Sequence, residues 1–290
     1  MDSAQVRIPS AGQESAIGAR LTVREKMRGQ VMSTISKSWR PTLLLALCFG
    51  IWWAISAGHL VAAYLVPSPG STLHVLTSQW GYLSHNAWVT GYETLLGFAG
   101  AAVVGVAAAV AMVYSPTAEK TFYPLLLFAQ VVPKIAVAPL FVVWLGFGLS
   151  PKVVIAVLIA FFPVVISMVS GLKSVDPEVL DLAATMGAGP VKAFAKIRFP
   201  AALPFLFSGL KVAVTLAVTG AVVGEFVGAD SGLGYVILQA NGNLDTPTLF
   251  AGLLLLSAIG VVLFALVDVG ERLLIPWHAS RRAQTTTSTL

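Results

Sequence analysis

Polar residues inside apolar segments are the first candidates for chemistry in this sequence. Lys134 lies within the apolar segment Phe122–Leu145, and Gln130 comes one helical turn earlier, so both side chains would share a helix face. Pro133 and Pro139 would interrupt the helical hydrogen bonds around them, and freed carbonyls could solvate the ammonium group. A lysine lining an internal path would suit an anionic or electron-rich small molecule. The alternatives are a structural lysine held by those carbonyls, or a shorter membrane path that lets the lysine snorkel toward the membrane surface.

Glu225 is a second polar residue at the edge of an apolar segment. It follows Gly224 near the end of the segment Leu203–Phe226 and precedes the glycine-containing stretch Val227–Pro247. A carboxylate at this point could act as a gate or contact a docking partner. It could equally be an interfacial carboxylate among lipid headgroups, and the sequence leaves both interpretations open.

No pattern in the sequence indicates catalysis. A phosphate-binding Walker A loop ends in Gly-Lys-Ser or Gly-Lys-Thr, whereas Lys173 and Ser174 follow Leu172. No cluster of His, Cys, Asp and Glu has metal-ligand spacing, and no serine lies in a Gly-x-Ser-x-Gly context. The histidines are scattered and are expected to be interfacial polar residues: His59, His74, His85 and His278. We therefore expect a chain that is not an enzyme and binds no cofactor or metal.

The composition excludes an ordinary soluble domain. Of the 290 residues, 57% are hydrophobic and 11% are charged, whereas soluble domains carry about 25% charged residues. Too few charges remain to cover a water-facing surface, so lipid is the expected surrounding of the outer face. The single cysteine, Cys48, lies in an apolar run and cannot form an intrachain disulfide.

Six apolar segments are long enough, or nearly so, to cross a membrane as helices, which takes about 20 residues each. Their apolar runs are continuous rather than alternating, which favours helices over barrel strands. The predicted fold is an all-α membrane protein with six transmembrane helices, at about 41–66, 91–113, 122–145, 153–170, 203–226 and 248–269. These spans define a transmembrane domain at 39–278, between a cytoplasmic N-terminal tail at 1–38 and a disordered C-terminal tail at 279–290.

The distribution of basic residues orients these spans. Lys and Arg gather in the N-terminal tail, in the loops after the second and fourth spans and in the C-terminal tail. The opposite loops carry only Lys152, while Lys134 and Lys211 lie within spans. Because positive residues favour the cytoplasmic side, both termini are predicted to be cytoplasmic. The net charge of +5 is then an orientation signal and does not require nucleic-acid binding.

Further patterns concern packing and the outer face. Small residues recur every four positions in the second span, at Gly97, Ala101, Gly105 and Ala109. This spacing lets two helices approach closely in a bilayer. The outer segment 67–90 contains an amphipathic stretch, 72–83, that is expected along the membrane interface. In the second outer segment, 227–247, the apolar run 233–238 predicts a short helix or a half-buried loop.

The loop between the fourth and fifth spans, 173–200, is long and patterned. Asp176 before Pro177 predicts a helix start, with an N-cap side chain and a proline at the first helical position. Gly187 would end this helix, and a second short helix is expected at 191–197. Apolar residues share one face of the first helix: Val179, Leu182, Ala183 and Met186. Because so short a helix is unstable alone in water, we expect this face to occupy a groove on a partner.

This loop resembles the motif of ABC importer permeases. The motif reads Glu-Ala-Ala, three residues, Gly, nine residues, Ile, one residue and Leu-Pro. The matching positions here are Asp181, Leu182, Ala183, Gly187, Ile197, Phe199 and Pro200. The sequence departs from the motif at three positions, with Asp181 in place of Glu, Leu182 in place of Ala and Phe199 in place of Leu. The bulkier Leu182 could alter the fit to an ATPase.

The resemblance covers about 85–277 and includes segments similar to nitrate/sulfonate/taurine-type permeases, such as 132–148 and 199–213. It implies a type I importer fold in a bacterial inner membrane, with a loop helix that couples the permease to ATP hydrolysis elsewhere. The implied partners are a second permease copy, two cytosolic ATPase subunits and a periplasmic or lipid-anchored binding protein. The implied substrate is a small anionic or heteroaromatic solute, such as a sulfonate, nitrate, taurine or a vitamin precursor. The main alternative is a secondary transporter, which would need charged relays that the spans nearly lack.

Overall fold

The computed structural model describes residues 42–58, 61–62 and 64–276, and all regular structure in these ranges is helical. The predicted tails, 1–38 and 279–290, lie outside the described residues, as do His59 and His278. The chain divides into two units, Met1–Pro69 and Gly70–Leu290, and each is described by itself.

The described part of the first unit is an apolar helix, Thr42–Ala57. It is shorter than the span predicted at 41–66, because the helix ends before Gly58. The indole Nε1 of Trp52 donates a hydrogen bond to the carbonyl oxygen of Pro67 at 3.0 Å, so the segment after the helix returns toward it. At about 1.5 Å per residue, this helix alone falls short of the hydrocarbon thickness.

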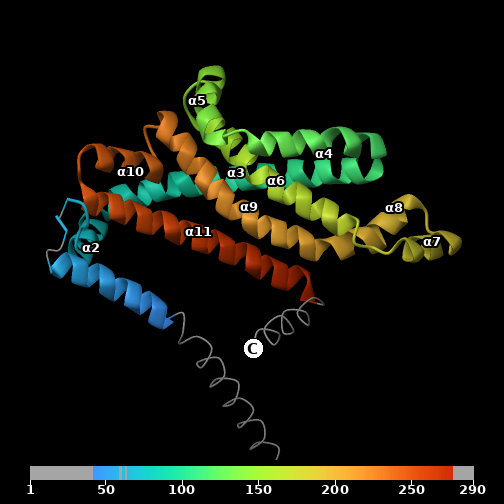
Figure 1. Cartoon of the computed structure of the whole chain (residues 1–290), viewed down its shortest axis with the longest axis horizontal. Helices are drawn as coiled ribbons and strands as arrows, with labels where there is room; N and C mark the ends of the chain where they lie inside the picture. The colour runs from blue at the N-terminus through green and yellow to red at the C-terminus, as the bar shows by residue number, and fades with distance from the viewer. Residues whose placement is uncertain (1–41, 59–60, 63, 277–290) are drawn as a thin grey trace, which may run out of the picture. The chain divides into compact units, whose positions relative to one another are not determined.

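The remaining helices are seen in Figure 1. In chain order they are α2 (Pro69–Ser78), α3 (Trp80–Tyr114), α4 (Pro116–Val131), α5 (Lys134–Leu145), α6 (Leu149–Leu172), α7 (Pro177–Thr185), α8 (Pro190–Ala193), the π-helical turn η1 (Phe194–Arg198), α9 (Phe199–Gly228), α10 (Leu233–Gly242) and α11 (Thr246–Leu274). Helix α9 continues α8 and η1 without a break, so that one helical run extends from Pro190 to Gly228.

The all-α membrane fold is confirmed by the lengths and composition of these helices. Four runs within the described residues are long and apolar enough to cross a membrane: α3, α6, α8 to α9, and α11. The predicted span 122–145 is not one straight helix, because α4 and α5 meet at a bend of 99°. Pro133 lies at this break, where its missing N–H and its ring prevent the helical hydrogen bonds from continuing.

Helices α3, α6 and α9 form the core through small residues. The four small residues of α3 that recur every four positions are all buried. A Cβ added at Gly105 would lie 2.9 Å from Cβ of Val164 on α6, and one added at Gly220 on α9 would lie 2.5 Å from Cα of Ala156. The small-residue spacing in the sequence therefore marks a true close contact between helices.

The two segments predicted to lie on the outer side differ in part from expectation. Helix α3 begins at Trp80, and Leu83 is completely buried, so the stretch 72–83 is not one interfacial helix. It is divided between α2 and α3 at Gln79. The short helix predicted at 233–238 is confirmed as α10, which buries Leu233, Val236 and Ile237.

Candidate functional site

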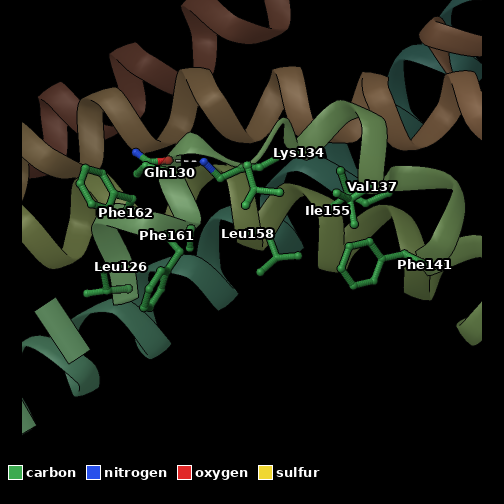
Figure 2. A pocket seen from close by; sticks show the side chains of 11 residues that line it. Leu126, Gln130, Lys134, Val137, Phe141, Ile155, Leu158, Phe161 and Phe162 are labelled. Carbon is green, nitrogen blue, oxygen red and sulfur yellow. Dashed lines mark hydrogen bonds between the residues drawn. The ribbon is translucent and has the colours of Figure 1, made fainter. Parts of the chain in front are cut away.

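The break between α4 and α5 places Lys134 beside Gln130. Lys134 is the first residue of α5, and its Nζ donates a hydrogen bond to Oε1 of Gln130 in the last turn of α4. The predicted contact between these two side chains is therefore present, although the helix that joins them is broken. The bend turns the Lys134 side chain back over the end of α4, as Figure 2 shows.

These two side chains line a pocket of about 350 Å³. Helices α4, α5 and α6 supply the rest of the lining, which is apolar and aromatic: Leu126, Ala129, Val132, Val137, Phe141, Ile155, Leu158, Phe161 and Phe162 (Figure 2). One cation and one amide thus face an otherwise apolar cavity. Such a cavity suits a ligand with a flat apolar body and one or two hydrogen-bond acceptors or a negative charge.

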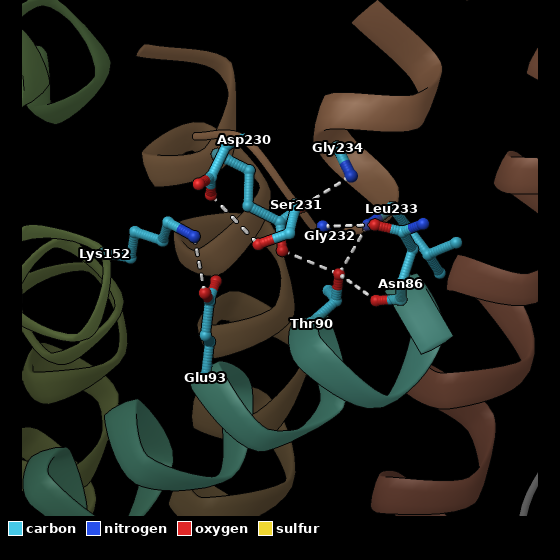
Figure 3. A network of polar contacts seen from close by, with 10 residues as sticks. Asn86, Thr90, Glu93, Lys152, Asp230, Ser231, Gly232, Leu233 and Gly234 are labelled. Carbon is cyan, nitrogen blue, oxygen red and sulfur yellow. Dashed lines mark hydrogen bonds and ion pairs between the residues drawn. The ribbon is translucent and has the colours of Figure 1, made fainter. Parts of the chain in front are cut away.

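A second polar group of residues, the buried polar cluster, joins α3, α9 and the start of α10 (Figure 3). Glu225, at the end of α9, accepts a hydrogen bond from the hydroxyl of Thr90 at 2.6 Å. Its other oxygen accepts from the backbone N–H of Gly234. Thr90 Oγ1 in turn accepts from the N–H of Leu233, and Asn86 Oδ1 accepts from the N–H of Gly232, each at 2.7 Å.

The cluster satisfies the first backbone donors of α10. A helix start leaves its N–H groups without helical partners, and here a carboxylate, a hydroxyl and an amide oxygen take three consecutive ones. Two glycines make room for the carboxylate, because a Cβ at Gly234 would lie 2.6 Å from Oε2 of Glu225 and one at Gly232 would overlap it. Gly232 also has φ of +108°, a conformation that favours glycine.

A buried ion pair lies next to this cluster. Nζ of Lys152, in the first turn of α6, is 2.7 Å from Oε1 of Glu93 on α3, and the side chains are 5% and 3% exposed. Lys152 was expected in a loop of the outer face, whereas it is buried inside the bundle. Gly224 of α9 permits this position, since its Cβ would come within 2.8 Å of Cα of Lys152.

Glu225 does not line the pocket of Lys134 and Gln130; its described contacts are with α3 and α10. Four other residues of this region were missed by sequence reasoning: Asn86, Thr90, Glu93 and Lys152. An acidic residue inside a long apolar helix was the available signal for Glu93. Its partner is 59 positions away, so the pairing itself had no local sequence signal.

The loop that precedes α9 forms the helix that was predicted. The carboxylate of Asp176 accepts from the N–H of Glu178 at 3.0 Å and caps α7. Gly187 follows α7 with φ of +78° and ends it, while the N–H of Ala188 donates to the carbonyl of Ala183 at 2.9 Å. The order of cap, proline and glycine therefore fixes this helix as the sequence indicated.

The motif residues of this loop lie at a surface. Asp181 and Leu182 are exposed, Leu182 by 62%, and Ala183 is half-buried. Other large apolar side chains of the loop are also exposed: Val179, Met186 and Val191. Ile197 and Pro200 are half-buried at the start of α9. The π-helical turn η1 just before α9 accommodates Pro200, which cannot donate a helical hydrogen bond. The structure thus divides the motif into an exposed helix and a packed base.

Charged residues also join α9 to α11. Lys211 forms ion pairs with Asp268 and with Glu271, the latter at 2.6 Å, and Arg272 pairs with Asp268 at 2.6 Å. The sequence-based statement that the spans nearly lack charged relays was therefore too strong. Arg272 and Asp268 belong to the same helix, whereas Lys211 pairs with α11 and Lys152 pairs with Glu93 across helices, which is how charges are tolerated within a membrane.

A family model described as "Binding-protein-dependent transport system inner membrane component" matches residues 101–276. The formylaminopyrimidine transport permease protein ThiX of Halalkalibacterium halodurans is 36% identical over 243 residues, which cover 82% of this chain and 95% of ThiX. The riboflavin transport system permease protein RibX of Chloroflexus aurantiacus is 37% identical over 243 residues, 82% of this chain and 89% of RibX.

A solved structure shares the fold. A chain of the MetNI methionine ABC transporter, in an inward-facing conformation, is similar with a TM-score of 0.59 and 21% sequence identity. The match covers 67% of this chain and 97% of that chain.

Proposed function

Because this chain belongs to the family of binding-protein-dependent transport system inner membrane components, we propose that two copies of it form the path for a small solute through the membrane. Two cytosolic ATPase subunits would hydrolyse ATP, and an extracytoplasmic binding protein would deliver the solute. The chain is the permease subunit of an ABC importer, so its own part is to change conformation around the path.

The observation that supports ATPase coupling is the exposed apolar surface of α7 and α8. Val179, Leu182, Met186 and Val191 are 47% to 82% exposed on α7, its C-cap and α8, and α7 is too short to be stable by itself. A cleft on each ATPase would cover this surface, and closure of the two ATPases would then move α6 and α9, which flank it. The basic residues of the loop favour its cytoplasmic placement, with both termini on the same side.

The pocket of Lys134 and Gln130 supports a heteroaromatic or anionic solute. Its volume of about 350 Å³ is at the small end of ligand sites, about 300–1,000 Å³. Phe141, Phe161 and Phe162 offer faces or edges for an aromatic ring. Relatives named for formylaminopyrimidine and riboflavin transport agree with this chemistry, and a small sulfonate is the second candidate that the single cation would accept.

Two measurements test this proposal. The first is the native mass of the detergent-solubilised complex, which should contain two permeases and two ATPases because each permease offers one docking helix. A lone permease monomer that transports would refute it. The second is a thermal-shift screen of the binding protein with pyrimidines, flavins and sulfonates, followed by uptake of the hit into vesicles that contain the complex. Uptake without ATP would contradict ATP-driven import.

A further inference from the structure

Beyond the solute path, we propose that a small polar pocket between α3, α10 and the start of α11 receives a basic side chain of the binding protein. This pocket, called the α10 socket below, is lined by Gln79, Tyr82, Val236, Gln239, Ala240, Asn243, Asp245 and Thr248. The inference rests on the proposed function, since it needs the extracytoplasmic partner and places α10 on that partner's side of the membrane.

The chemistry of the α10 socket favours a cation. Its lining includes one carboxylate, Asp245, and no Lys, Arg or His. Asp245 caps α11 by accepting from the N–H of Thr248 at 3.3 Å, and its described hydrogen bonds use only Oδ1. The socket lies at the C-terminal end of α10, where the helix dipole favours positive charge, and at the N-terminal end of α11, where the dipole opposes it, so the preference for a cation rests on the Asp245 carboxylate.

One polar group within the socket lacks a partner in the described structure. Thr248 is 6% exposed, and its hydroxyl oxygen has no hydrogen-bond partner among the described residues. A buried hydroxyl without a partner is costly, about 1–3 kcal/mol. The Tyr82 hydroxyl, by contrast, donates to Oε1 of Gln239 at 3.3 Å. Because the Thr248 hydroxyl is enclosed by neighbouring atoms, an inserted ammonium or guanidinium group would donate to Oδ2 of Asp245, which no described hydrogen bond uses, rather than to Thr248.

The size of the α10 socket excludes the transported solute as its occupant. Its volume is about 150 Å³, below the range of about 300 Å³ and more that holds a whole small-molecule ligand. The tip of one long side chain fits such a space. The neighbouring Leu244 adds an apolar contact, since it is 69% exposed and held at φ of +55°, a conformation that is rare for leucine.

The buried polar cluster connects the α10 socket to the core. Glu225, Thr90 and Asn86 hold the first N–H groups of α10 against α3 and α9. Gly232 and Gly234 are in close contact with the Glu225 carboxylate, so a larger residue at either position would clash with it. A displacement of α10 on docking would therefore also displace α3 and α9. Docking of the binding protein would in this way favour one arrangement of the core helices.

The test compares two single charge removals on the same outer segment in the reconstituted complex. Asp245→Asn removes the socket's carboxylate but retains a side chain that can cap α11. Asp230→Asn is the matched control, because Asp230 is exposed in the link between α9 and α10 and does not line the socket. ATPase activity is measured against the concentration of solute-loaded binding protein, at low and high salt.

We expect Asp245→Asn to raise the half-saturating concentration of binding protein about 10-fold or more and to weaken its salt dependence, with little change for Asp230→Asn. Equal curves for wild type, Asp245→Asn and Asp230→Asn would overturn the socket. Absence of stimulation in the wild type would instead count against the proposed function, so the two failures are distinguishable.

Discussion

Nζ of Lys152 lies 2.7 Å from Oε1 of Glu93, and together these side chains tie the first turn of α6 to α3. The pair is buried next to the contacts that hold α10, where Gly224 lets α6 approach α9 closely. If one partner of such a pair is mutated, the remaining buried charge has no water to solvate it. The pair therefore tests how the end of the bundle that carries α10 is held together.

Removal of one partner of this pair should be more damaging than removal of both. Lys152→Met leaves the Glu93 carboxylate buried and alone, which costs about 3–5 kcal/mol. We expect a clear loss of thermal stability in detergent for Lys152→Met and a partial recovery in the double variant Lys152→Met, Glu93→Gln. The single variant Glu93→Gln completes the comparison. If the stability losses of Lys152→Met and Glu93→Gln simply add up in the double variant, the ion pair is not the cause.

Gly234→Ala should destabilise the attachment of α10. The added Cβ would lie 2.6 Å from Oε2 of Glu225, so the carboxylate or α10 must shift, at about 1–3 kcal/mol. Gly242→Ala is the matched control on the same helix, since a Cβ there has no heavy atom within 4 Å. Thermal unfolding of the two purified variants measures the difference, and similar melting temperatures would contradict the proposed role of the cluster.

Gly187→Val should detach or uncouple the ATPase. The φ of +78° at Gly187 costs other residues about 1–2 kcal/mol and is worse for a β-branched side chain, so the turn after α7 would change. Co-purification of the ATPase and solute-stimulated ATP hydrolysis report the effect. Gly189→Val is the control, because Gly189 has φ of −67° and open space around its Cα. Normal transport by Gly187→Val would mean that the loop does not couple the two subunits.

Lys134→Met should abolish transport while assembly and basal ATP hydrolysis stay intact. The change removes the one cation among the described residues that line the pocket, and it retains a long apolar side chain. Lys120→Met, on an exposed lysine of α4, controls for loss of positive charge. Uptake of labelled solute into proteoliposomes is the measurement. Loss of assembly would assign Lys134 a structural role, and unimpaired uptake would remove it from the path.

The local parts of this protein could be predicted from its sequence because the signals lie within a few residues of each other. Asp176, Pro177 and Gly187 determine where α7 begins and ends, through capping, a fixed φ and a left-handed residue. The proximity of Gln130 and Lys134 followed from one helical turn, and the long apolar runs identified a membrane protein. The family resemblance likewise rested first on spacing within one loop and then on short similar segments elsewhere in the chain.

Tertiary structure alone decided which distant polar groups meet. Glu93 and Lys152 are 59 positions apart, and Thr90 and Glu225 are 135 apart, so no local pattern could pair them. The angle of 99° between α4 and α5 was also beyond the sequence: prolines predict an interruption, but the packing of neighbouring helices decides the direction of the chain after it. Burial of Lys152 depends in the same way on glycine at position 224, on a helix that is distant in sequence.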